Sequence, residues 1–526
     1  MPVRIVILLL LGAGLLSGAA RLRGAEYDEF YSLFVTSGTP RPDWPGGTFR
    51  AGQIRLILAN SASPARIAAE LRRTDVHPPL YFWALATWRG LAGHGLRTAR
   101  LLSVLAALAA LGLVGAVAAA SGVPAAPAMA FTLGSYAFVY TGAIARDFAL
   151  AEALALGGTW LALHAAAAPR APPRRFAAAG LLLGAASFTN YLATFIGAAV
   201  LAGLALPALR PGRIGDRRRD AVTAGACLAG MAVWLPAGLW FFVAQRDSRV
   251  GQFTPFRLGG SLLLLARDAG GAVFGGLPLY VSGAARLAVG AALALLLAGL
   301  AGLIAARWRR IGRGRARLVL GLGAVAPAVG LLGLGLVFDS TPIELRYLAF
   351  ATPFFGLLLA GALATLKPRP AGAIGALVLG VQALALAGLL TRPETMQPGR
   401  AAAAAAARLA GRRGVVLLAR GNDGVGVVGP FLLEAPPWLR VRLVTPAMSP
   451  AALRQAAAGA SRVVLALVGV DRDSRATVRH LRAAFAGGSW RVLGRGFDAL
   501  ALTPATPAPP GARVSRSHRG TSPRAG

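Results

Sequence analysis

An acidic pair stands among aromatic residues directly after the first apolar segment of the chain. Asp28 and Glu29 belong to the sequence YDEFYSLF (27–34), between Tyr27 and Phe30. Acids at a membrane interface can simply be solvated, but apolar neighbours on both sides argue against a free polar loop. A carboxylate half-buried among aromatic rings has a raised proton affinity and can act as a general base. Asp28 and Glu29 are therefore the first catalytic candidates.

A second charged pair, Arg146-Asp147, stands between two apolar segments, 125–142 and 148–168. Ionisable residues at membrane spans are costly and are functional suspects by default. A local ion pair at a helix end is the simpler alternative.

Four more residues have side chains suited to chemistry, and each has a structural alternative. His77 opens a Pro-Pro segment and could be a turn residue, as could Asn190, which lies between two short apolar runs. Arg346 and Tyr347 precede a late apolar run, where an interfacial anchor is the alternative. We take Arg346 and Tyr347 as candidate functional residues, and His77 and Asn190 as possible supporting residues.

A divalent metal ion is the one cofactor that these residues suggest. Asp28, Glu29 and His77 offer oxygen and nitrogen ligands, although these three residues do not by themselves specify a metal site. The sequence contains no phosphate-binding P-loop, no zinc-ligand spacing and no nucleophile elbow.

The composition indicates that lipid is the solvent for most of the chain. Of the 526 residues, 56% are hydrophobic and only 14% are charged, whereas a soluble chain has about a quarter charged residues. The net charge of +35 could indicate nucleic-acid binding or arginines at the inner face of a membrane. Because many arginines cluster between apolar runs, we favour the membrane and expect no nucleic-acid partner.

Eleven apolar segments approach the length of about 20 residues that a membrane-spanning helix needs. They are 3–20, 98–120, 125–142, 148–168, 176–189, 191–207, 221–243, 284–306, 318–337, 346–366 and 371–390. A signal peptide is the alternative for the first, which we interpret as an uncleaved span. The segments 176–189 and 191–207 are short, so one of them could be re-entrant or tilted.

Four basic loops orient these segments. The positive-inside rule places 169–175, 210–219, 307–317 and 367–370 in the cytoplasm. Two predicted crossings separate each consecutive pair, so the assignment is self-consistent. The N-terminus is then cytoplasmic, and the loop that contains Asp28 (21–97) lies outside together with Asp147. This requires 77–93, with its aromatic residues and Arg89, to be an interfacial helix on the outer face.

The sequence changes character near residue 395. Short runs at 414–420, 441–446 and 461–469 have the pattern of buried strands, and 401–410 and 477–487 that of helices. We predict a membrane domain over 1–394 and a small α/β domain over 395–505 outside the membrane. The Pro/Arg/Ser-rich tail 506–526 is typical of disorder.

The order of several motifs resembles that of a known family. After the first span and YDEFYSLF come HPPLYFWAL, GLRTARLLSVLAAL, ARDFALAEALAL, FTNYLATF and ELRYLAFATPFF. This order, over about residues 1–365, resembles that of the integral-membrane GT-C glycosyltransferases. The nearest branch is glycosyltransferase family 39, which includes protein mannosyltransferases and aminoarabinose-lipid A transferases.

The resemblance implies an inner-membrane enzyme that moves a hexose or pentose from a polyprenyl-phosphate donor to an envelope lipid, glycan or protein. It implies that Asp28 is the base, that Asp147 is the second-loop acid and that Arg346-Tyr347 matches the Arg-Tyr before a late span. The chain has almost no lysine, so Arg146 or Arg346 must bind the phosphate. Attack opposite the leaving phosphate predicts inversion. The resemblance implies that Tyr347 joins Arg346 in phosphate binding. One alternative is a polytopic transporter or lipid flippase. Another is a non-catalytic assembly or scaffold protein that carries an outer α/β domain.

Overall fold

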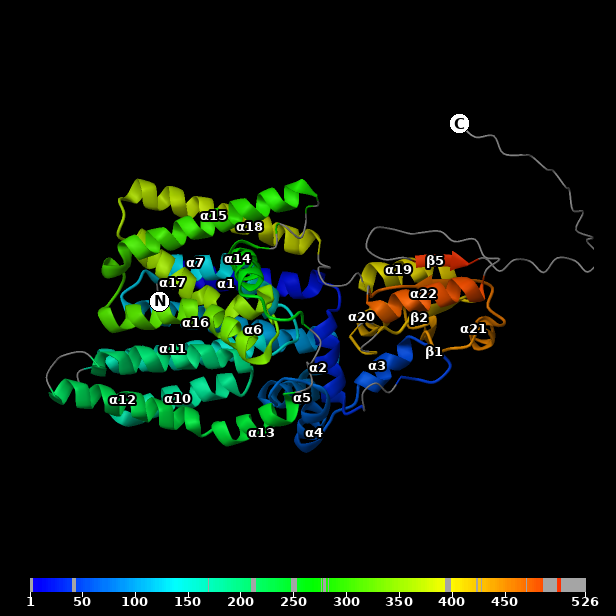
Figure 1. Ribbon diagram of the computed structural model, residues 1–526, viewed down its shortest axis with the longest axis horizontal. Coiled ribbons are helices and arrows are strands. Elements are labelled where there is room, and N and C mark those ends of the chain that lie inside the picture. Colours follow the sequence, from blue (N-terminus) through cyan, green and yellow to red (C-terminus); the bar gives the residue numbers. More distant parts are fainter. Residues whose placement is uncertain are drawn as a thin grey trace, which may run out of the picture. The chain divides into compact units, whose positions relative to one another are not determined.

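The computed structural model divides the chain into two compact units (Figure 1). Unit 1 consists of Met1–Trp44 and Ile54–Gly399, and unit 2 of Pro45–Gln53 and Arg400–Gly526. The structure describes residues 3–39, 44–168, 170–209, 214–246, 253–275, 277, 281, 283–392, 399–421, 424–426, 428–469, 471–485 and 499–502. The predicted tail 506–526 lies outside the described residues.

Unit 1 is a bundle of apolar helices. In its described part, eight helical segments are long and apolar enough to cross a membrane, and a bent pair would make nine. The eight are α1 (Val3–Leu22), α6 (Leu96–Ser121), α9 (Phe148–Ala167), η1-α11-η2 (Tyr191–Ala208), α15-η4 (Ala284–Arg310), α16 (Gly314–Phe338), η5-α17 (Leu345–Leu363) and α18 (Pro368–Thr391). The chain is therefore a multi-pass membrane protein.

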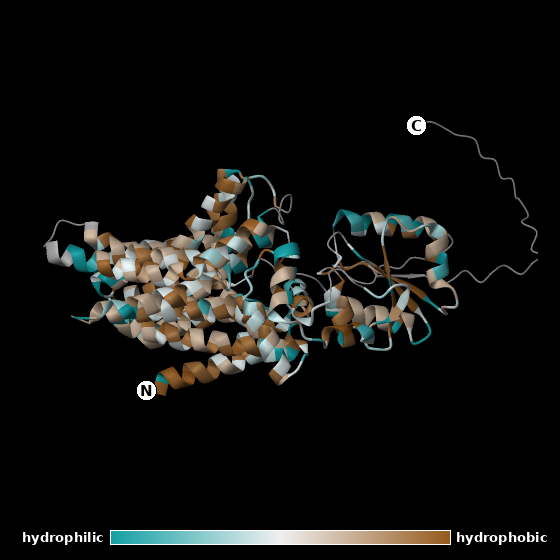
Figure 2. Ribbon diagram, turned by 90° about the horizontal axis from the view of Figure 1, so that it is seen from below, coloured by the Kyte–Doolittle hydropathy of each residue, from teal (hydrophilic) through white to brown (hydrophobic). Residues whose placement is uncertain are grey.

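Apolar side chains on the outside of the bundle indicate where lipid contacts it. Leu10 of α1 is 68% exposed, and Leu287 and Leu295 of α15 are 77% and 73% exposed. Figure 2 shows α1 apolar along most of its length. Water disfavours an apolar surface of this extent, whereas the hydrocarbon core of a bilayer accommodates it.

The predicted count of eleven crossings is not confirmed. Segment 125–142 divides at Ser135, whose backbone is extended, into α7 (Ala125–Gly134) and α8 (Tyr136–Gly142). Segment 176–189 becomes α10 (Pro173–Ser187), whose 15 residues fall short of the usual span length.

A third predicted span, 221–243, is bent. It forms α12 (Ile214–Ala232) and α13 (Leu235–Gln245), and the apolar parts of the two helices meet at 53°. Pro236 stands in the first turn of α13, where a proline without an N–H group is tolerated but cannot continue the preceding helix.

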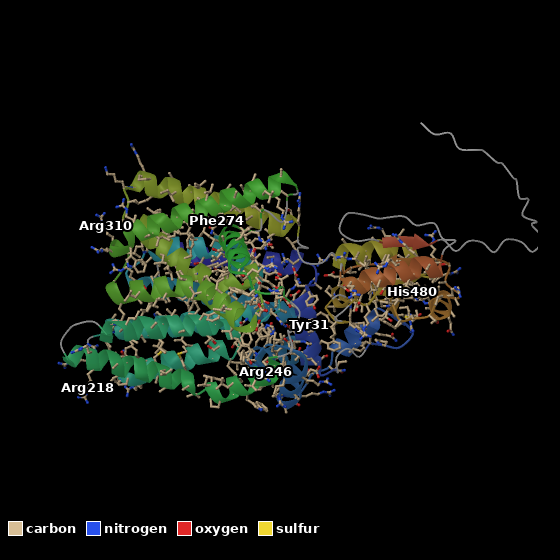
Figure 3. The ribbon with its side chains drawn as sticks, viewed as in Figure 1. Tyr31, Arg218, Arg246, Phe274, Arg310 and His480 are labelled. Atoms are coloured by element: carbon tan, nitrogen blue, oxygen red, sulfur yellow. The ribbon has the colours of Figure 1, made fainter. Side chains whose placement is uncertain are left out.

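The two ends of the bundle differ. Figure 3 shows Arg218 and Arg310 at one end and Tyr31 and Arg246 at the other. The end with Tyr31 contains the short helices α2 (Tyr27–Ser37), α4 (Pro64–Thr74) and α5 (Leu80–Ala92). Unit 1 also contains α14 (Leu258–Phe274), within the predicted outer loop 244–283, and most of α3 (Gly52–Leu58). Arg218 and Arg310, from two of the four basic loops, thus lie at the end opposite Tyr31 (Figure 3), which agrees with the charge rule.

Helix α5 is tied to its neighbours by a buried arginine. Arg89 is 1% exposed and donates hydrogen bonds to the hydroxyl of Thr36 and to the carbonyls of Leu33 and Leu58. The cost of burying a guanidinium is offset only when its donors find acceptors. Arg89 therefore fixes α5 against α2, which helps to position Asp28 and Glu29.

Unit 2 contains a five-stranded sheet in the order β1-β3-β2-β4-β5. The central strands β2 (Val415–Ala419), β3 (Arg440–Val444) and β4 (Val463–Ala466) are parallel, and β5 (Ala499–Leu502) is antiparallel to β4. Every described residue of β2 and β4 is buried, as expected for parallel strands covered on both faces. The helices are α19 (Gly399–Ala410), α20 (Gly429–Glu434), α21 (Pro450–Ala457) and α22 (Arg472–Ala484).

One edge strand of this sheet comes from a part of the chain far before residue 395, where the predicted domain begins. Strand β1 (Thr48–Arg50) belongs to the predicted outer loop 21–97 and pairs antiparallel with β3, with Thr48 opposite Arg442. Backbone hydrogen bonds between strands cannot form across a bilayer. Residues 48–50 and unit 2 must therefore lie on the same side, and the chain crosses the membrane an even number of times between them. Nine or eleven total crossings, including α1, satisfy this condition, whereas eight do not.

Candidate active site

Glu29 has a hydrogen-bond partner at every side of its carboxylate. Its side chain is completely buried, and Arg100 donates Nε to Oε1 at 2.7 Å and Nη2 to Oε2 at 2.6 Å. The backbone N–H groups of Ala145 and Glu26 donate to the same two oxygens at 2.8 and 2.9 Å. A carboxylate accepts about four hydrogen bonds, so Glu29 is saturated. These contacts suit a structural role, in which Glu29 joins separate segments of the chain, better than the role of a general base.

Arg100 is a central residue that the sequence reasoning missed. Besides Glu29, it donates to the carbonyls of Ala20, Arg23 and Gly24, which connect α1 to α2. The available signal was an arginine in the first turns of the apolar segment 98–120, where a charge is retained only with partners. Arg100 and Glu29 together fix the start of α2, the helix that positions Asp28.

Asp28 lies one residue before Glu29, and its side chain is 14% exposed. Its Oδ2 accepts a hydrogen bond from Nη1 of Arg346. Arg346, whose side chain is 13% exposed, also pairs with Glu344 at 2.7 Å. The structure thus brings the predicted base and a predicted phosphate-binding residue into direct contact.

Asp147 has a different environment. Its side chain is completely buried, and neither carboxylate oxygen has a hydrogen-bond partner among the described residues. Nε2 of His77 lies 3.8 Å from Oδ2 of Asp147, and Nε of Arg146 lies 3.9 Å from Oδ1. Burying a carboxylate without hydrogen bonds is costly. Such residues cluster at functional sites.

His77 and Arg146 connect the surroundings of Asp147 with the helix that contains Asp28. Nδ1 of His77 lies 2.8 Å from Oδ1 of Asp75, and Nη2 of Arg146 lies 3.0 Å from the same ring nitrogen. Nη1 of Arg146 donates to the Asp28 carbonyl at 3.4 Å and to the Ser32 hydroxyl at 3.3 Å. Arg146 therefore contacts α2 on one side and the loop with His77 on the other.

Asp75 is a second member of this cluster that the sequence reasoning missed. It is 7% exposed; burial alone would raise its pKa, but His77 and Arg146 hold the pKa of Asp75 well below its usual range. Gln245 holds the same loop, because its Nε2 donates to the carbonyls of Leu71 and His77. The only sequence signal for Asp75 was its spacing of two residues from His77.

Asn190 and Tyr347 have contacts that position other groups. Asn190 accepts a hydrogen bond from the N–H of Leu192 and begins η1, which matches its interpretation as a turn residue. Tyr347 is 7% exposed, and its ring lies 6.4 Å from that of Phe148 at 22°. Because Phe148 directly follows Asp147, this stacking places η5 beside the start of α9.

The residues suggested for a metal ion do not converge. Glu29 binds Arg100 and Asp28 binds Arg346, whereas His77 pairs with Asp75. Within the described ranges, no three His, Cys, Asp or Glu side chains lie close enough together to hold a metal ion. Asp28, Glu29 and His77 thus do not fit a shared metal ion in this arrangement.

Two solved structures have this arrangement of helices. Crystal structures of ArnT from Cupriavidus metallidurans match with TM-scores of 0.54 with undecaprenyl phosphate bound and 0.52 in the apo state, each at 16% identity. The first match covers 96% of this chain and 98% of ArnT, and the second covers 94% and 97%. This chain has the GT-C glycosyltransferase fold. The GT-C fold predicted from the motif order is therefore confirmed, whereas membership of family 39 is not shown.

The comparisons of sequence found no match to this chain. No family model matches the sequence, and no curated protein matches it either. At this identity the likeness establishes the fold, and a function must be argued from the site.

Proposed function

We propose that the chain is a membrane glycosyltransferase that moves a sugar from a polyprenyl-phosphate donor to an acceptor hydroxyl. The observation that carries the proposal is the contact between Asp28 and Arg346, on a fold shared with ArnT. ArnT has been solved with undecaprenyl phosphate bound. Such a donor requires a cation for the phosphate and a base for the acceptor, and these two side chains supply both.

In the central step of the proposed mechanism, Arg346 leaves Asp28 and binds the phosphate of the donor. Arg346 pairs with Asp28 and Glu344 in the structure. A lipid-linked phosphate competes for the same guanidinium, and an Arg–phosphate contact is frequently bidentate. When Arg346 turns to the phosphate, the carboxylate of Asp28 becomes free to accept a proton. Donor binding would therefore activate the base.

The proposed transfer is a single displacement. The acceptor oxygen attacks the anomeric carbon and forms the new glycosidic bond, while its proton moves to Asp28. The bond between the anomeric carbon and the phosphate oxygen breaks, and the electron pair leaves with the phosphate, where Arg346 stabilises the added charge. Attack opposite the leaving group inverts the configuration of a transferred hexose or pentose.

For Asp147 and Arg146 we propose positioning functions. The family resemblance implies catalysis by Asp147, but its carboxylate is fully buried beside His77 and Arg146. Arg146 likewise contacts Asp75, His77 and the start of α2, so Arg346 is the better phosphate ligand. In this proposal Asp147 attracts Arg146, and Arg146 orients the backbone at Asp28.

The proposed setting is the outer face of the inner membrane. Arg218 and Arg310 lie at the bundle end opposite Tyr31 (Figure 3), which supports a cytoplasmic basic end. With eleven crossings, the N-terminus is cytoplasmic, and the candidate site and unit 2 lie outside. The acceptor is then an envelope lipid, glycan or protein.

Transfer from a synthetic polyprenyl-phosphate sugar by the purified full chain tests the proposal. We expect a lipid, glycan or peptide hydroxyl to receive the sugar, with loss of transfer in Asp28→Asn. Movement of the intact donor across a vesicle bilayer, without any transfer, would indicate the alternative, a lipid flippase.

A further inference from the structure

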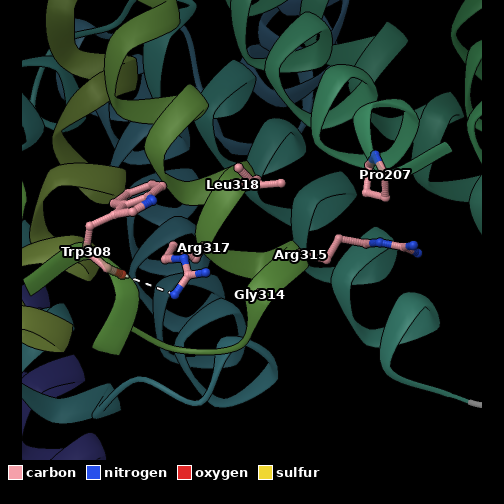
Figure 4. A pocket seen from close by; sticks show the side chains of 6 residues that line it. All are labelled: Pro207, Trp308, Gly314, Arg315, Arg317 and Leu318. Carbon is pink, nitrogen blue, oxygen red and sulfur yellow. Dashed lines mark hydrogen bonds between the residues drawn. The ribbon is translucent and has the colours of Figure 1, made fainter. Parts of the chain in front are cut away.

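The end of the bundle opposite the candidate active site contains a separate pocket (Figure 4). Its volume is about 310 Å³, and its lining combines arginines with a tryptophan and small apolar residues from η2 (Leu206–Leu209), η4 (Trp308–Arg310) and α16. The lining residues are Pro207, Trp308, Gly314, Arg315, Arg317 and Leu318. Arg310, next to the pocket in sequence, lies at the same basic end as Arg218 (Figure 3).

Arg317 presents an unused edge in this pocket. Its Nη1 donates to the carbonyls of Trp308 at 3.3 Å and Arg309 at 2.6 Å, contacts that fix the plane of the guanidinium. Its Nε is buried and has no hydrogen-bond partner among the described residues. The Nε–Nη2 edge of a guanidinium is a planar two-point donor whose geometry matches two oxygens of a phosphate.

The surrounding charge favours an anion. Residues 307–317 contain six arginines and no acid. Arg315 pairs with Asp220 at 2.5 Å, so this acid offsets one of the six charges. An uncompensated buried Nε next to this excess of arginines is an electrostatic site for a negatively charged group.

Trp308 indicates that the anion belongs to a lipid. Its ring lies 5.7 Å from the guanidinium of Arg317, and tryptophan favours the headgroup level of a bilayer. Basic pockets between membrane helices on the cytoplasmic side bind acidic headgroups. A diffuse positive-inside loop would also attract such lipids, but it would not require a fixed guanidinium whose Nε has no hydrogen-bond partner among the described residues.

We propose that this pocket binds the phosphate headgroup of an acidic membrane lipid through Nε and Nη2 of Arg317. The site is independent of the proposed glycosyl transfer, because it lies at the other end of the bundle. Trp308 contributes the apolar wall against which the glycerol part of the headgroup packs. The remaining arginines raise the local concentration of acidic lipid.

Retention of phosphatidylglycerol by the purified full chain, measured by native mass spectrometry, tests the proposal. We expect Arg317→Ala to weaken retention about tenfold or more, because a two-point, charge-assisted contact is lost. Arg317→Lys keeps the charge and should restore only part of the affinity. Arg310→Ala removes an equal charge outside the lining and should change affinity less than about twofold.

Three results would overturn the proposal. Equal losses in Arg317→Ala and Arg310→Ala would indicate unspecific attraction by the basic segment. Unchanged lipid affinity in Arg317→Lys, with an unchanged melting temperature, would show that binding does not depend on a two-point contact. Displacement of the lipid by inorganic phosphate at equal concentration would assign the pocket to a soluble anion.

Discussion

The guanidinium of Arg346 pairs with the carboxylate of Asp28, although 318 positions separate them in the chain. One residue belongs to η5 before a late span, and the other to α2 after the first. Their contact joins α2 to η5 and keeps two oppositely charged groups side by side with little access to water. In the proposed reaction, the same two groups serve the donor and the acceptor.

Asp28→Asn should lower transfer by about 10²–10⁴, because removal of a general base typically costs that much in rate. The substitution keeps the shape of the side chain, so insertion and donor binding should persist. The measurement is transfer from a synthetic polyprenyl-phosphate donor by purified variants, with expression level and donor binding recorded in parallel.

A matched control is Glu70→Gln, which removes an acid of α4 that pairs with the exposed Arg73; it should transfer normally. If Asp28→Asn keeps nearly full activity while Asp147→Asn has none, the base has been assigned to the wrong loop. Activity in both variants would contradict the proposed mechanism as a whole.

Glu29→Gln should act on folding rather than on chemistry. The change leaves Arg100 buried without its counter-ion, and breaking a buried pair in this way costs about 3–5 kcal/mol. We expect a lower melting temperature and less folded protein, with transfer per folded molecule reduced less than in Asp28→Asn. Normal stability combined with lost transfer would show that Glu29 takes part in the reaction.

Arg346→Ala should weaken donor binding more than acceptor binding. The hydrogen bonds at stake involve a charged group and contribute about 1.5–3 kcal/mol each, which corresponds to roughly a tenfold to hundredfold change in affinity. Arg346→Lys should rescue part of the loss, since lysine cannot make the planar two-point contact.

Donor and acceptor titrations of the same preparations distinguish this result from a general defect. Arg73→Ala, at a side chain that is 63% exposed, is the control for loss of a positive charge at the same end of the bundle. Equal losses of donor and acceptor affinity in Arg346→Ala would indicate misfolding instead of a phosphate ligand.

Asp75 should make stability depend on pH. Because His77 and Arg146 lower its pKa in the folded state, the unfolded chain binds the proton more readily, and stability falls as the pH drops through and below about 4. Asp75→Asn should therefore be less stable than the wild type at pH 7, and the difference should shrink toward acid pH. Melting temperatures across a pH series measure this, and a difference independent of pH would contradict it.

Topology can be tested with reporter fusions. Fusions after residues 172, 214, 312 and 368 should report the cytoplasm, and fusions after 60, 260 and 450 the outside. The pairing of β1 with β3 adds a stricter requirement, namely that positions 60 and 450 report the same side. Opposite signals would contradict an even number of crossings between them.

Many residues of the site were predictable from the sequence, but the residues that contact them were not. The aromatic surroundings of Asp28 and the isolated Arg146-Asp147 pair are local features, and both meet in one cluster with His77. Glu29 could not be separated from Asp28 by pattern, because the two are adjacent acids in the same motif. Only the contacts of Arg100 with Glu29 distinguish a saturated carboxylate from one at the edge of the site.

The sequence by itself determined that lipid is the solvent, where the apolar segments lie and which end of the bundle is basic. These properties follow from local composition, since the transfer of apolar and charged side chains from water is nearly additive along a chain. Tertiary structure decided that residues 48–50 complete a sheet with residues beyond 400 and that Arg346 pairs with Asp28. It also buried the carboxylate of Asp147 without a hydrogen-bond partner in the described part of the chain. Such pairings depend on which distant groups folding brings within a few ångströms, and neither periodicity nor composition encodes that choice.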